Sequence, residues 1–142
     1  MNGRAVAYWI CTILIAFVFL SGGVADVLRP PQVLEGMTHL GYPPYFMIIL
    51  GIWKLLGGIV ILLPALPRLK EWAYAGMIFD LTGATASHLA VGDDLRHIVT
   101  PLVIAAVVVA SWALRRESRR LDRVSESRAG RELEAAMASP GA

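Results

Sequence analysis

Three ionisable side chains interrupt segments of the sequence that are otherwise apolar. Lys54 lies in the segment 45–63, and Asp80 and His88 lie in the segment 72–91. An ionisable group inside a membrane-spanning helix is costly, so it faces the bundle interior or a cavity. We therefore expect these three residues to form an intramembrane polar site that handles a ligand or a proton.

Lys54 and Asp80 carry opposite charges at similar distances from the ends of their segments. If the two segments are adjacent antiparallel helices, the residues lie at similar depth and form an ion pair. Two interpretations stay open. The pair lines a pocket or proton path, or it fixes the register of the two helices, as buried polar groups do in some proteins.

Glycines flank both of these charged residues. Gly51 and Gly58 lie near Lys54, and Gly76 and Gly83 lie on either side of Asp80. Small residues allow membrane helices to approach closely, because lipid supplies no hydrophobic drive for helix association. We expect the helices that carry these glycines to pack tightly.

A second group of polar residues lies at or near the ends of the apolar segments. We expect this group on the outer side of the membrane that the helices cross. Its members are Asp26, His39, Asp93, Asp94 and His97. Histidines and carboxylates bind metals or transfer protons, but they also cap helices. Only Asp93 and His97 have helical i, i+4 spacing, so we predict no metal site. The sequence contains no nucleophile or nucleotide-binding motif, and it identifies no catalytic residue.

The composition indicates that these residues belong to a membrane protein. Hydrophobic residues make up 56% of the 142 residues and charged residues 17%, whereas a soluble domain has about a quarter charged residues. A membrane span needs about 20 mostly apolar residues. Four segments are long enough: 5–25, 45–63, 72–91 and 98–114. We predict an all-α, integral membrane four-helix bundle; a cleavable signal peptide is the alternative interpretation of the first segment.

The segment between the first two predicted spans is too short and polar to cross a membrane. Pro30 and Pro31 favour the start of a helix and Gly41 favours its end. Helical spacing places four apolar residues on one face: Val33, Leu34, Met37 and Leu40. We predict a short amphipathic helix on the outer surface.

The basic residues predict the orientation. One side of the bundle would hold seven of them: Arg4, Arg68, Lys70, Arg115, Arg116, Arg119 and Arg120. The other side would hold Arg29 and Arg96. Because basic residues favour the cytoplasmic side, both termini are expected in the cytoplasm. The Arg-rich tail, 115–142, is predicted to extend the last helix at first and then to be disordered. No basic-aromatic patch indicates a nucleic-acid partner.

Several stretches of the sequence resemble the DoxX-like family of small four-helix bacterial membrane proteins. They are LGYPPYF (40–46), LGIWKLLGG (50–58), LKEWAYAG (69–76) and FDLTGATASHLAVGD (79–93). The resemblance covers about residues 26–114. It implies a location in the bacterial cytoplasmic (inner) membrane. It also implies a role as a membrane subunit or anchor of a quinone- or sulfur-linked oxidoreductase, with redox-enzyme subunits as partners.

Two other functions remain open at this point. The chain has no redox cofactor motif of its own, so a quinone would be a bound lipid-soluble molecule. A small-solute carrier that acts as a homo-oligomer is one alternative function. A purely structural or assembly protein is another. A continuous cavity that joins Lys54, Asp80 and His88 would favour a ligand site. A filled interface around Lys54 and Asp80 would favour a structural role.

Overall fold

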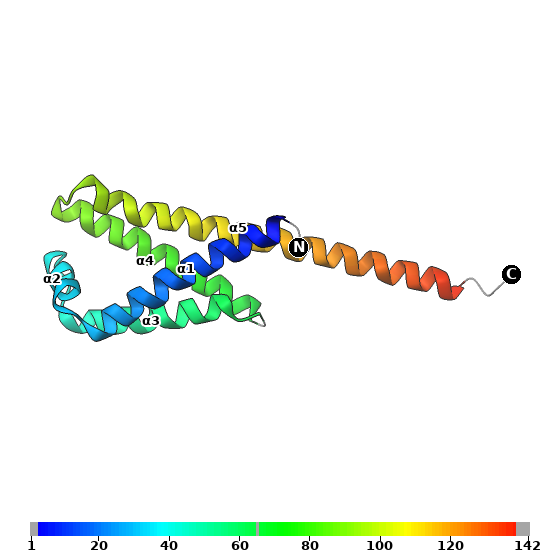
Figure 1. The fold of residues 1–142 in the computed structure, drawn as a ribbon, viewed down its shortest axis with the longest axis horizontal. Helices are drawn as coiled ribbons and strands as arrows, with labels where there is room; N and C mark the ends of the chain where they lie inside the picture. The colour runs from blue at the N-terminus through cyan, green and yellow to red at the C-terminus, as the bar shows by residue number, and fades with distance from the viewer. Residues whose placement is uncertain (1–2, 65, 139–142) are drawn as a thin grey trace.

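The computed structural model describes residues 3–64 and 66–138, and these residues form five α-helices (Figure 1). In chain order the helices are α1 (Gly3–Leu28), α2 (Pro31–His39), α3 (Pro44–Leu62), α4 (Pro67–Val91) and α5 (Leu95–Ala138). The prediction of an all-α protein is confirmed. The four predicted spans correspond to the four long helices, and the predicted short helix corresponds to α2.

The four long helices lie side by side and the chain reverses direction at each connection (Figure 1). Helices α1 and α4 therefore run one way, and α3 and α5 run the other. Helix α1 packs most extensively against α3 and also contacts α5, whereas α3 and α4 make fewer contacts with each other. The loose α3–α4 interface matters for the candidate site described below.

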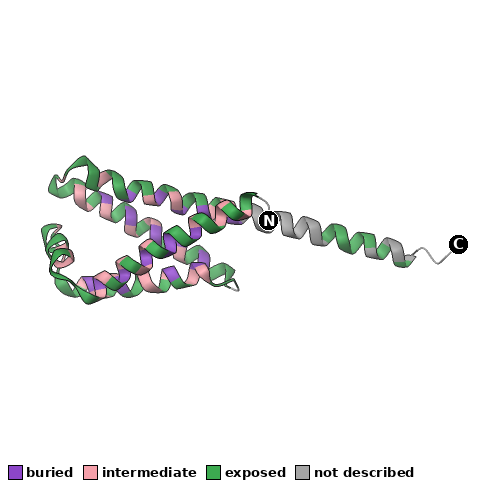
Figure 2. Ribbon diagram, in the orientation of Figure 1, coloured by how far each residue is buried: buried purple, intermediate pink, exposed green. Residues whose placement is uncertain are grey.

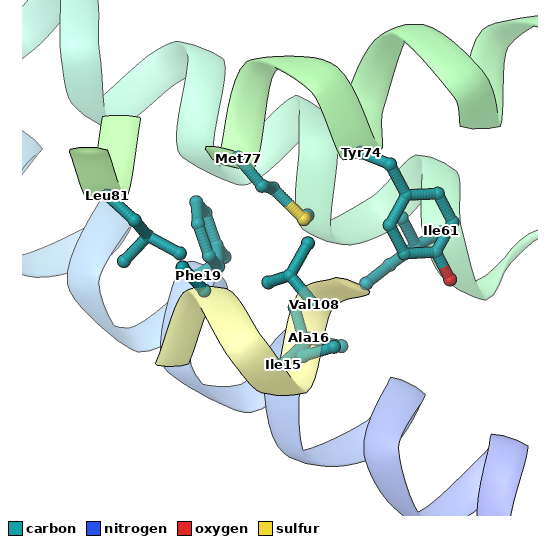
Figure 3. Close-up of a cluster of buried hydrophobic side chains, with 9 residues drawn as sticks. Ile15, Ala16, Phe19, Ile61, Tyr74, Met77, Leu81 and Val108 are labelled. Atoms are coloured by element: carbon teal, nitrogen blue, oxygen red, sulfur yellow. The ribbon is translucent and has the colours of Figure 1, made fainter. Parts of the chain in front are cut away.

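The apolar core lies mainly where α1, α4 and α5 meet near the middle of the bundle, and Ile61 of α3 also belongs to it (Figure 3). Phe19 of α1, Met77 of α4 and Val108 of α5 are nearly or fully buried there. A chain of buried hydroxyl groups links the same helices. The Ser111 hydroxyl lies 2.9 Å from that of Thr12 and 2.9 Å from that of Tyr74. These hydrogen bonds satisfy polar groups that would be costly to bury alone.

Exposed positions recur along each helix of the bundle (Figure 2), and many of them carry large apolar side chains. Large exposed side chains include Phe17, Trp72 and Phe79. Among the described residues, three helices are long and apolar enough to cross a membrane: α1, α3 and the Leu95–Arg115 part of α5. Helix α4 is not one of them, because Asp80, His88 and several hydroxyl-bearing residues make it less apolar. The fourth span stays a prediction.

Glycines allow α1 and α3 to approach at backbone distance. A Cβ atom placed on Gly51 would lie 2.8 Å from the carbonyl oxygen of Gly23, and one on Gly23 would lie 2.9 Å from that of Gly51. A Cβ on Gly58 would lie 2.9 Å from the Leu20 side chain. The prediction of tight packing is therefore confirmed for α3. It is wrong for α4, because Gly76 and Gly83 have no heavy atom within 4 Å of such a Cβ.

Helix α5 is longer than the sequence analysis predicted. It begins at Leu95 and continues to Ala138, whereas disorder was expected after the first part of the tail. Arginine, glutamate, leucine and alanine are good helix formers, and Arg128 pairs with Glu132 one turn further along. Beyond the bundle, α5 projects as a single helix (Figure 1).

Candidate ligand-binding site

Three charged side chains from three helices meet inside the bundle. Lys54 of α3 donates a hydrogen bond from Nζ to Oδ2 of Asp26 on α1, at 2.9 Å. The same Nζ atom lies 3.8 Å from Oδ2 of Asp80 on α4. We call Asp26, Lys54 and Asp80 the charged cluster. It contains two carboxylates and one ammonium group.

The close contact between α1 and α3 explains the position of Asp26. Gly23 lies one turn before Asp26, and a Cβ on Gly51 would lie 3.0 Å from the Asp26 Cβ. With the backbones this close, the Asp26 carboxylate reaches Lys54, one turn beyond Gly51. The Asp26 side chain is 7% exposed, compared with 21% for Lys54 and 18% for Asp80. Asp26 is therefore the most enclosed member of the cluster.

The polar residues are grouped in the structure differently from the two groups predicted from the sequence. The predicted Lys54–Asp80 contact is present, but Asp26 lies closer to Lys54 than Asp80 does. Asp26, which the sequence placed at the outer surface, belongs to the charged cluster. His88, which the sequence placed with Lys54 and Asp80, instead contacts Asp93. The sequence signal for Asp26 was its position one turn after Gly22 and Gly23.

Asp93 connects two histidines at the end of the bundle where α4 turns into α5. Its Oδ2 lies 2.6 Å from Nδ1 of His88, and its Oδ1 lies 2.7 Å from Nε2 of His39 on α2. Hydrogen bonds from His88 and His39 lower the pKa of Asp93. The His97 ring lies beside that of His88, with 5.6 Å between centroids. Asp94 accepts main-chain hydrogen bonds at the start of α5.

The hydrogen bonds of Asp93 join α2 to the turn between α4 and α5. The hydroxyl groups of Tyr42 and Ser87 add a second link, at 2.8 Å. Within the described residues, no three histidine, cysteine, aspartate or glutamate side chains are arranged to hold a metal ion. The hydrogen bonds of Asp93 and of Tyr42 connect α2, and the segment that follows it, to the end of α4.

A cavity of about 420 Å³ lies between α3 and α4 and reaches the charged cluster. Lys54 and Asp80 line its polar end, and apolar side chains line most of the rest, including Leu50, Trp53 and Trp72. Binding sites for small molecules are typically about 300–1,000 Å³, mostly apolar, with a few polar groups that orient the ligand. The α3–α4 cavity has this size and character.

A smaller cavity of about 210 Å³ is lined by the same Lys54 and Asp80 together with residues of α1 and α5. Ala84 and Pro101 lie in its lining. Pro101 is inside α5 and has no N–H, so it cannot donate the helical hydrogen bond to the carbonyl of His97. His88 lines neither of these two cavities. The predicted cavity thus joins Lys54 and Asp80, but not His88.

The fold and the apolar helix surfaces define a helical membrane protein with several membrane-spanning helices. The chain matches the DoxX-like family over residues 10–111. It therefore belongs to the DoxX-like family. Comparison with curated proteins and with solved structures finds no significant match.

Proposed function

We propose that the chain crosses the bacterial cytoplasmic membrane four times, with both termini in the cytoplasm. Helices α3 and α5 run in the same direction (Figure 1), and this arrangement supports a crossing of the membrane by α4 between them. With 25 residues, α4 is about 37 Å long, which exceeds the hydrocarbon thickness of about 30 Å. Asp80, the α4 residue of the charged cluster, faces Lys54 of α3, as expected for an ionisable group at membrane depth. Helix α2 would lie at the outer surface.

We further propose that the α3–α4 cavity binds a lipid-soluble molecule with a polar head group. The observation that carries this proposal is the shape of the cavity, which is apolar along most of its lining and ends at Lys54 and Asp80. The Lys54 ammonium would donate a hydrogen bond to an oxygen of the head group. Trp53 and Trp72 would contact the apolar body.

In this role the protein would serve as the membrane subunit or anchor of an oxidoreductase system, with a quinone as the bound molecule. Membership of the DoxX-like family supports this proposal. The quinone carbonyl suits the Lys54 donor, and its apolar tail suits the cavity. A partner redox enzyme would supply the electrons.

Two glycines of α4 allow a direct test. Gly76 lines the cavity and Gly83 does not, and both have open space where the Cβ atom of a larger residue would lie. The substitution Gly76→Phe should fill the cavity and abolish binding of decylubiquinone to the purified protein, measured by titration calorimetry. The substitution Gly83→Phe, the matched control, should leave binding unchanged. Equal binding by wild type and Gly76→Phe would contradict the proposal.

A small-solute carrier is the second candidate, because two cavities meet at Lys54 and Asp80 from different sides of the bundle. A carrier would move solute across proteoliposome membranes without a redox partner. If the cluster is only structural, neutralising Lys54 and Asp80 together should leave both ligand binding and transport unchanged.

A further inference from the structure

The charged cluster contains one more negative charge than positive charge. Lys54 donates its hydrogen bond to Asp26, and these two residues form a neutral pair. Asp80 lies 3.8 Å from the same ammonium nitrogen, which is too far for a hydrogen bond. An unbalanced carboxylate at membrane depth is costly. The cluster therefore requires a further positive charge.

The surroundings of Asp80 restrict the source of that charge. Among the side chains that line the two adjoining cavities, the charged ones are Lys54 and Asp80 themselves. Helices α5 and α1 contribute only uncharged side chains to these linings, such as Pro101 and Phe19. Asp26 of α1 reaches the cluster through its bond to Lys54. The balancing charge must therefore be a proton or a cation that enters the cavity.

The larger cavity is suited to an organic cation. Asp80 lines its polar end, and the indole of Trp53 on α3 belongs to the same lining. Carboxylates and indole faces both attract organic cations, and desolvation strengthens this attraction. Apart from Lys54, the rest of the lining is apolar and includes Leu50, Val60 and Trp72. A ligand that matches this cavity has one positive charge and an apolar body.

We propose that the α3–α4 cavity binds a lipophilic monocation, such as a quaternary ammonium or phosphonium compound, with its charge at Asp80. Without the cation, a proton on the cluster balances the extra carboxylate. The cation replaces this proton, so the bound cation and one released proton keep the charge balanced. The inference rests on the proposed function only in that the cavity binds a ligand.

The test compares a cation with a neutral ligand on the full-length protein in a non-ionic detergent. Calorimetry in buffers of different ionisation enthalpy reports both affinity and proton release. Tetraphenylphosphonium should bind more tightly as the pH rises and release about one proton per cation bound. Decylubiquinone, which is neutral, should release none.

The substitution Asp80→Asn retains the size of the side chain but removes its charge. It should weaken tetraphenylphosphonium binding by at least about tenfold and abolish proton release. The matched control Asp94→Asn, at the start of α5, should behave as wild type. If Asp80→Asn does not fold, the pH dependence and proton release of the wild-type protein decide the question.

Each result has a defined meaning. Cation binding that is independent of pH, or equal in wild type and Asp80→Asn, would overturn the inference. Binding of decylubiquinone without binding of tetraphenylphosphonium would also overturn it, while supporting the proposed function. Cation binding that Gly76→Phe abolishes, in a protein that does not bind decylubiquinone, would support the inference and contradict the quinone proposal.

Discussion

The two interfaces of α3 differ sharply in how closely the helices approach. Against α1, Gly23 and Gly51 bring the backbones so close that neither position has room for a Cβ atom. Against α4, Gly76 has open space around it and a cavity of about 420 Å³ separates the helices. Glycines thus have two uses here. On the α1 side they position Asp26 against Lys54, and on the α4 side they leave open space between the helices.

Lys54 is the residue that both interfaces share, so its replacement should have the largest effect. The substitution Lys54→Met leaves two carboxylates without their cation, Asp26 being almost fully enclosed. Breaking a buried ion pair by removing one partner costs about 3–5 kcal/mol. We expect a loss of about that size in the free energy of unfolding, measured by SDS titration in mixed micelles.

The double variant Lys54→Met/Asp26→Asn serves as the control for that prediction. Neutralising Asp26 removes the buried charge, so part of the lost stability should return. If the double variant is as unstable as the sum of the two single variants, Asp26 and Lys54 are not coupled in the way we describe.

A pair of glycine substitutions tests the comparison itself. The substitution Gly51→Ala places a methyl group 2.8 Å from the carbonyl oxygen of Gly23, which the backbone cannot easily avoid. Overpacking of this kind costs about 1–3 kcal/mol. The substitution Gly76→Ala, into open space, should be neutral or slightly stabilising, since alanine favours helix. Equal effects in the same unfolding assay would contradict the difference between the interfaces.

The hydroxyl chain should contribute less than the tight interface. The substitution Ser111→Ala removes the hydroxyl that Thr12 and Tyr74 both contact, leaving two buried groups without this partner. A loss of about 1 kcal/mol in the free energy of unfolding is expected. The control is Ser21→Ala, because Ser21 is exposed and bonds only locally. A smaller loss for Ser111→Ala than for Ser21→Ala would show that the chain does not hold α1, α4 and α5 together.

Loss of the hydrogen bonds that Asp93 makes with His39 and His88 should have the smallest effect on stability, and this effect should depend on pH. Because His88 and His39 lower the pKa of Asp93 in the folded protein, its contribution is present above the ordinary carboxyl pKa of about 4. It is lost as the pH falls through the lowered folded-state value. Wild type should melt at a higher temperature than Asp93→Asn at pH 7, and the difference should shrink below pH 4.

Asp94→Asn is the control for this prediction, because the side chain of Asp94 makes none of the contacts described for Asp93. A difference between wild type and Asp93→Asn that stays constant from pH 7 to pH 3 would contradict the assigned role of Asp93.

The sequence predicted the elements better than the contacts between them. Apolar length and proline positions were enough to predict the four long helices and α2. The contact of Lys54 with Asp80 followed from depth alone. The contact of Lys54 with Asp26 did not, because it depends on how closely α1 and α3 cross at Gly23 and Gly51.

Local turn geometry explains the second difference from the sequence prediction, which is the contact of His88 with Asp93. Gly92 adopts a left-handed conformation, with φ of 76°, and the amide of Asp93 bonds to the carbonyl of His88. This is a Schellman motif. It folds Asp93 back onto His88, which lies two helical turns, about 12 Å, along α4 from Asp80. Gly92 followed by Asp93, at the end of the predicted span, was the sequence signal for this turn.

The central claim, that a lipid-soluble molecule occupies the α3–α4 cavity, is tested most directly by photo-crosslinking in native membranes. A diazirine-bearing quinone analogue, followed by mass spectrometry, would report the residues that contact it. We predict labelling of the less exposed residues of the cavity lining, such as Leu50, Ala73 and Met77, with competition by unlabelled decylubiquinone and loss in Gly76→Phe. Labelling confined to the outward faces of α1 and α5, or insensitive to competitor, would contradict the claim.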